Sequence, residues 1–126
     1  CLWLGVNDME KIIFCSLLLV SMNSLAKEIK TKEQAIENIC GDASVYAKQV
    51  MNGRQVGVMI SDALKIANES NMPDEKLKFY KSIIYNAYKE PKVIDEALQV
   101  SIENEYSNSV YMTCSDAMMR NLPDTN

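Results

Sequence analysis

The sequence contains no histidine, and it has few of the residues that interrupt helices. Without histidine, the chain lacks the commonest general base and the commonest metal ligand of proteins. Its three prolines and four glycines in 126 residues disfavour a turn-rich β fold. The sequence also lacks a Gly-rich phosphate loop and a CxxC pair. Glu103 and Glu105 are two residues apart and so point to different helix faces. We therefore expect neither an enzyme nor a metal or cofactor site.

The charge balance excludes one class of partner. The net charge is −4, so the chain has no basic surface for nucleic acid. The composition is 48% hydrophobic and 24% charged, which is ordinary for a globular protein. The length allows one domain.

The N-terminal part of the chain has the pattern of an export signal. An apolar run at residues 12–20 follows Met9, and small residues at positions −3 and −1, Ser24 and Ala26, predict cleavage before Lys27. The run is shorter than the roughly 20 residues that span a bilayer. We predict a signal peptide at 9–26, against the alternative of a buried N-terminal helix. Residues 1–8 precede Met9, and we interpret them as a non-native upstream extension rather than a genuine one.

The remaining part, residues 27–126, is predicted to be a single helical domain with one disulfide. It contains two cysteines, Cys40 and Cys114, and a cysteine pair in a small exported domain indicates a disulfide. Closing such a loop stabilises a chain by about 4 kcal/mol. The alternative is two free buried thiols, which would require the chain to stay in a reducing compartment. The predicted location is therefore periplasmic or secreted.

Hydrophobic periodicity predicts four helical segments. The first follows a capping box at residues 31–34 and ends at Gly53 or, better, Gly57. The second covers 63–68, and the third starts around Pro73 and reaches Lys89. The fourth runs from about Val93 to Arg120. The sequence thus predicts an all-α bundle of three or four helices, with the disulfide joining the first helix to the last.

Two apolar rows define the expected core faces. On the first helix the row comprises Ile36, Ile39, Cys40, Ala43, Ala47, Val50 and Met51. On the last helix it comprises Leu98, Ile102, Tyr106, Val110 and Cys114. Steps of four residues drift by about 40° each on an α-helix, so the second row indicates a helix that wraps its neighbours or bends.

Arg54 is the most unusual polar residue, because it continues the core-facing row of the first helix. An arginine there must reach water or meet a partner. We predict a structural polar site at Arg54 and Gln55, formed either by a buried ion pair or by hydrogen bonds to helix-end carbonyls. The candidate carboxylate partners are Asp62, Asp95, Glu96 and Glu103. A ligand-binding anion site is the alternative. Gln55 is expected to bond the backbone.

Aromatic and methionine side chains offer two further candidate surfaces. Tyr80, Tyr85 and Tyr88 are a candidate interface, since tyrosine combines apolar area with a polar tip; the alternative is a place in the core. Met112, Met118 and Met119 suggest an adaptable binding surface, or simply gap-filling packing.

A joint pattern runs through most of residues 36–116. It comprises Cys40, Ala47, Val50-Met51-x-x-Arg54-Gln55-x-Gly57, Ile84-x-x-Ala87-Tyr88-x-x-Pro91, Tyr106 and Tyr111-x-x-Cys114. This pattern resembles that of a family of small exported helical proteins found in proteobacteria and in their phages and prophages, which generally have no assigned function. The resemblance implies an export signal, paired cysteines and a bacterial or phage setting. It implies no catalytic residues, cofactor or ligand.

These observations predict a non-enzymatic binding or accessory module, with a phage-related role fitting the resemblance. Its expected partner is another protein or an envelope component. The alternative is a periplasmic chaperone or stress-response protein, because such proteins are also small, helical and held by one disulfide.

Overall fold

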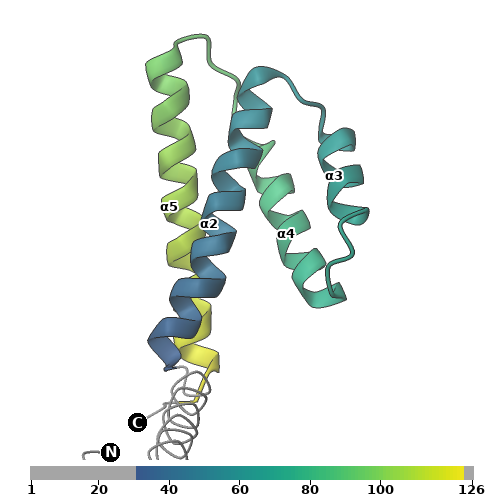
Figure 1. Ribbon diagram of the computed structural model, residues 1–126. Coiled ribbons are helices and arrows are strands. Elements are labelled where there is room, and N and C mark those ends of the chain that lie inside the picture. Colours follow the sequence, from purple (N-terminus) through teal and green to yellow (C-terminus); the bar gives the residue numbers. More distant parts are fainter. Residues whose placement is uncertain (1–30, 124–126) are drawn as a thin grey trace, which may run out of the picture. The chain divides into compact units, whose positions relative to one another are not determined.

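The computed structural model describes residues 31–123, and this part of the chain folds into four helices without strands (Figure 1). The helices are α2 (Lys32–Val56), α3 (Ile60–Asn68), α4 (Asp74–Ala87) and α5 (Glu96–Asn121). A disulfide between Cys40 and Cys114 joins α2 to α5. The predicted all-α fold and its disulfide are thereby confirmed. The predicted extension (1–8), signal peptide (9–26) and cleavage point lie outside the described residues.

The C-terminal end of α2 is set by Gly57. This glycine has a φ of 99°, a left-handed conformation that other residues adopt only with strain. Its amide donates to the Arg54 carbonyl at 3.3 Å, and the Val58 amide donates to the Gly53 carbonyl at 2.8 Å. These two bonds form a Schellman motif, which satisfies carbonyls that the helix end would leave unpaired. Gly57, rather than Gly53, therefore ends the helix.

The start of α3 differs from its prediction. The helix begins at Ile60, three residues before the predicted start, because the Met59 carbonyl accepts bonds from the Asp62 amide at 3.1 Å and the Ala63 amide at 3.2 Å. Asn71, in the break that follows, has a φ of 58°. Asparagine tolerates this left-handed conformation better than most residues, so it permits the reversal into α4.

α4 ends earlier and α5 begins later than the sequence predicts. Pro73 is the N-cap of α4, which ends at Ala87 instead of Lys89. The predicted start of the last helix near Val93 is replaced by Glu96, because Asp95 is the N-cap. Its carboxylate accepts the Leu98 amide at 2.8 Å. Residues 88–95 therefore form a connector outside both helices.

α2 is the central helix of this unit. It packs antiparallel along α5, which is its most extensive contact, and it also contacts α4 (Figure 1). α3 packs on α4. Small residues permit this central position, since Ala43 and Ala47 have no exposed surface. Beside them the rings of Tyr46 and Tyr80 stack with their centroids 4.5 Å apart.

The predicted apolar rows include two residues that lie at the surface. Ile39 is 53% exposed and Leu98 is 49% exposed, so both were wrongly assigned to the core. The four-residue steps of the last row explain Leu98, because the accumulated rotation turns the N-terminal end of the row away from α2. Residues 103, 107 and 114 of α5 instead contact α2, through Asn52, the Ser44 carbonyl and Cys40.

Candidate functional site

Gln55 holds the connector between α4 and α5 from the end of α2. Its side chain is only 3% exposed. The amide nitrogen donates to the Pro91 carbonyl at 3.0 Å, and the amide oxygen accepts the Val93 amide at 2.9 Å. One glutamine thus satisfies an acceptor and a donor in a segment without regular structure. Gln99 adds a bond from its side-chain nitrogen to the Val93 carbonyl at 2.6 Å.

Arg54 bonds the same connector. Its Nε donates to the Glu90 carbonyl at 3.1 Å, and its guanidinium carbon lies 5.3 Å from the centre of the Tyr88 ring. Such a cation–π contact contributes about 0.5–1 kcal/mol at an exposed position. Tyr88 in turn donates its hydroxyl proton to the Val58 carbonyl at 2.6 Å. We call Arg54, Gln55, Tyr88 and the 90–93 segment the connector clamp.

The carboxylates proposed as partners of Arg54 have other roles. Asp95 caps α5, as described above. Glu103 is 7% exposed and accepts a bond from the Asn52 side chain at 2.8 Å. Within residues 31–123 the guanidinium is thus bound by the Glu90 carbonyl of the connector and by the Tyr88 ring, instead of by Asp62, Asp95, Glu96 or Glu103. The ion-pair alternative is wrong, and carbonyl binding takes its place.

The three candidate interface tyrosines have three different environments. Tyr80 lies in the core against Tyr46, and burial raises the pKa of both phenols. Tyr88 belongs to the connector clamp, while Tyr85 is 51% exposed on α4. The three side chains have separate surroundings, so they do not line one groove together, and a role as an interface stays a prediction.

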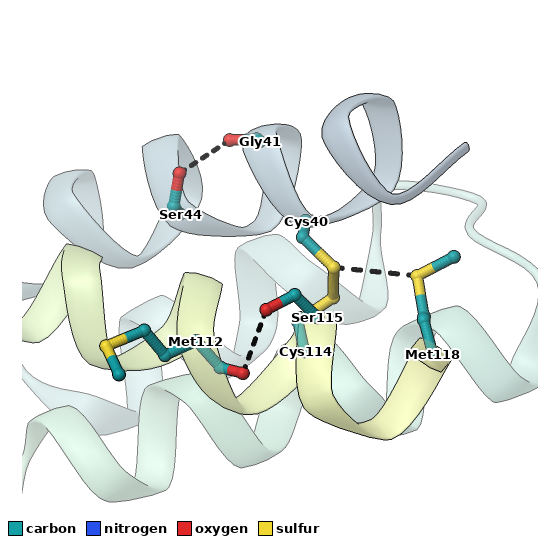
Figure 2. Close-up of a disulfide and its surroundings, with 7 residues drawn as sticks. All are labelled: Cys40, Gly41, Ser44, Met112, Cys114, Ser115 and Met118. Atoms are coloured by element: carbon teal, nitrogen blue, oxygen red, sulfur yellow. Dashed lines mark hydrogen bonds between the residues drawn. A yellow bond between two sulfur atoms is a disulfide. The ribbon is translucent and has the colours of Figure 1, made fainter. Parts of the chain in front are cut away.

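The methionines near the C-terminal end of α5 also differ in their surroundings. The sulfur of Met118 lies 3.5 Å from the Cys40 sulfur, and Figure 2 shows it beside the disulfide. Met118 therefore packs around the buried cysteine pair. Met112 and Met119 are exposed.

A groove lies between α4 and α5. Two hollows of about 230 and 290 Å³ share the lining residues Tyr106 and Ser109, so they lie next to each other. We call the two together the α4–α5 groove. Its apolar part is formed by Phe79, Ile83, Ile102, Tyr106 and Val110. Its polar rim is formed by Ser82, Asn86, Glu90, Glu105, Ser109 and Thr113.

Tyr106 links the two helices that line the groove. Its ring extends from α5 toward α4, and its hydroxyl donates to the Ile83 carbonyl. Burial raises the pKa of this phenol to about 12; a backbone hydrogen bond lowers it and the charge of Glu90 raises it. The two helices are thereby joined through a side chain that forms part of the groove itself.

The groove's polar groups suit binding better than catalysis. Ser109 donates its hydroxyl proton to the Tyr106 carbonyl at 3.0 Å, and Ser82 donates to the Phe79 carbonyl at 2.5 Å. Both hydroxyls are thus used within their own helices, and neither is aligned with a base. Among the residues that line the groove, the charged ones are Glu90 and Glu105. The surface can therefore accommodate apolar side chains and, at one end, a cation.

Sequence reasoning missed this groove. Ile102, Tyr106 and Val110 were placed on one apolar row and assigned to the core, yet all three are only half-buried. The polar residues Ser109 and Thr113 beside that row were the available signal, because a fully buried helix face would not alternate with hydroxyls.

The described residues contain no group of three or more His, Cys, Asp or Glu side chains arranged to hold a metal ion. Across residues 31–123, no helix combines the length and the apolarity that crossing a membrane requires.

Comparison with protein-family models, with curated proteins and with solved structures finds no match to this chain. The resemblance to small exported proteins of bacteria and phages stays a prediction.

Proposed function

We propose that this chain is an exported, non-enzymatic module that binds another protein in its α4–α5 groove. The groove is the observation that carries this proposal. It combines an apolar floor with a polar rim, which is the composition of surfaces that recognise protein segments. Apart from Glu90 of the connector, its residues come from α4 and α5, and a site built on helices loses little entropy on binding.

Export is supported by the disulfide and by the sequence pattern before it. The Cys40–Cys114 bond is compatible with an oxidising compartment outside the cytoplasm. The apolar run at 12–20 and the small residues Ser24 and Ala26 supply the proposed signal. N-terminal sequencing of the protein from its host should begin at Lys27. An intact Met9 in cytosolic material would contradict export.

The binding site is tested by crosslinking at two adjacent positions. A photoreactive phenylalanine analogue at Ser109 lies in the groove, whereas the same group at the exposed Asn108 lies outside it. We expect irradiation in the host to give one discrete protein adduct, identifiable by mass spectrometry, at position 109 but not at 108. Equal labelling at both positions would show that the groove is not the site.

A phage-related role follows from the resemblance alone. It is supported by the joint pattern from Cys40 to Cys114 and by the export signal expected for such proteins. Lysis or tail genes beside this gene would support the role, and a conserved host envelope operon would contradict it.

A chaperone is the second candidate, favoured by exposed apolar side chains. Ile94 is 98% exposed, and Val56 and Met59 are also at the surface. A chaperone should bind a hydrophobic dye on acidification and suppress the aggregation of other proteins. A monomer that stays folded and binds no dye at low pH would leave the single-partner module as the better proposal.

A further inference from the structure

From the shape and charge of the α4–α5 groove, we infer that its occupant is a cationic amphipathic helix of another protein. This inference rests on the proposed function and adds the chemical class of the partner to it. The partner helix would set apolar side chains on Phe79, Tyr106 and Val110 and place a lysine or arginine near Glu90 and Glu105.

The dimensions of the groove fit a short helix. The α5 wall runs from Ile102 to Thr113. At 1.5 Å per residue this wall is about 17 Å long, which is the length of about three helical turns. The exposed Leu98 lies one turn before Ile102 and extends the apolar wall. A helix in this position would lie against both α4 and α5 as a further helix of the bundle.

The walls of the groove exclude an extended peptide. Both walls are helices whose backbone groups are bonded within the helix, and residues 31–123 contain no strand edge to which a peptide could pair. An extended segment would lose water from its own amides without gaining partners. A helix satisfies its backbone internally and so presents only side chains to the groove.

The charge of the groove selects a basic partner. Glu90 and Glu105 lie at the end of the groove that also contains Ile102. The Glu105 carboxylate accepts only a 3.4 Å bond from Ser101, and the Glu90 bond to Arg54 uses its backbone carbonyl. Both carboxylates are therefore available to a cation. Lipid is a poor occupant, because these carboxylates would repel anionic headgroups.

The test uses synthetic helical peptides and the full chain with its disulfide intact. The probe is a lactam-stapled peptide of about 15 residues, with leucines at helical spacing and two lysines at one end. One matched peptide has glutamates instead of the lysines, and another has its leucines scrambled. We expect the lysine peptide to bind, as read by fluorescence anisotropy, and the two matched peptides to bind at least about tenfold more weakly.

Substitutions in this chain then test where the lysine peptide binds. Ser109→Trp fills the groove and should abolish binding of the lysine peptide, while Asn108→Trp, one residue away and outside the groove, should leave it unchanged. Glu90→Gln combined with Glu105→Gln should weaken binding about fivefold, a typical effect for partly exposed ion pairs. Asp116→Asn, an exposed position on α5 outside the groove, is the matched charge control.

The outcomes separate this inference from the proposed function. Equal binding of the lysine and glutamate peptides, or binding unaffected by Ser109→Trp, would overturn the cationic helix. If no peptide binds but crosslinking at position 109 still captures one protein, the groove is a binding site and the partner class is wrong. If the chain sediments as a dimer that Ser109→Trp dissociates, the occupant is a second copy and the inference is also overturned.

Discussion

The two ends of the α2–α5 pair are held by different chemistry. At one end a buried disulfide joins Cys40 to Cys114, and Met118 packs beside it (Figure 2). At the other end the connector clamp uses hydrogen bonds from Arg54 and Gln55 to the backbone of residues 90–93. The two ends differ because they contact different kinds of structure. At the disulfide two helix faces pack together. The clamp instead bonds a connector outside the helices, whose backbone groups need hydrogen-bond partners.

Removing the disulfide should lower the stability of the protein more than any change in the clamp. In the Cys40→Ser, Cys114→Ser variant, the unfolded chain regains the freedom of a long loop, so the free energy of unfolding should fall by about 4 kcal/mol. For a domain of this size the melting temperature should drop by about 20 °C. Thermal unfolding followed by circular dichroism measures this.

The control for that variant is the wild-type protein treated with reductant, which should melt at a similar temperature. A fall of less than about 1 kcal/mol would show that the clamp end alone holds the two helices together.

The clamp depends most on Gln55. Gln55→Ala should lower the free energy of unfolding by about 2 kcal/mol, because the partly buried Pro91 carbonyl and Val93 amide both lose their partner. Urea unfolding measures the change. Gln49→Ala, an exposed glutamine on the same helix, should change it by less than about 0.5 kcal/mol. If the two substitutions lowered the free energy of unfolding equally, Gln55 would not stabilise the connector as described.

Arg54 should contribute less, because it is only half-buried. Arg54→Met keeps the apolar stem but loses the bond to the Glu90 carbonyl and the contact with the Tyr88 ring. We expect a loss of about 1 kcal/mol in the free energy of unfolding. Arg54→Lys keeps the charge over the Tyr88 ring, so its stability should lie between those of the wild type and Arg54→Met. An unchanged melting temperature for Arg54→Met would contradict the role given to this arginine.

Between the two ends, Tyr106 should have an effect that appears only at high pH. Its pKa is raised from 10 to about 12 in the folded chain. The unfolded chain therefore ionises first, so the contribution of Tyr106 to stability is full below pH 10 and is lost as the pH rises toward 12. An absorbance titration of the phenols should show a late step, absent in Tyr106→Phe. A last step near pH 10 would show that the phenol is not buried against α4.

The sequence predicted the features that depend on one residue type or on one helix. The two cysteines of residues 27–126 indicated the disulfide, and Gly57 indicated the end of α2. Both signals are local, because glycine alone adopts the left-handed cap readily and two cysteines allow one pairing.

The features that sequence reasoning missed depend on the relative placement of helices. The partner of Arg54 is a backbone carbonyl, which every residue possesses and which no side-chain pattern identifies. The α4–α5 groove arises because both helices pack on α2 while Tyr106 spans the space between them. Periodicity shows that Ile102 and Val110 share a face, but it does not show that this face is only half-covered.

The central claim of this account is that the disulfide and the connector clamp stabilise the α2–α5 pair independently. Cys40 and Gln55 are separated by about 22 Å along α2, well beyond the range at which substitutions usually couple. The direct measurement is a thermodynamic cycle of four proteins: wild type, Gln55→Ala, Cys40→Ser with Cys114→Ser, and the triple variant. Urea unfolding in the presence of a stabilising osmolyte keeps all four folded at the start.

Additive losses, agreeing within about 0.5 kcal/mol, are the predicted result. A triple variant no less stable than the cysteine-free variant would contradict the account, because it would mean that the clamp forms only when the disulfide holds the helices together.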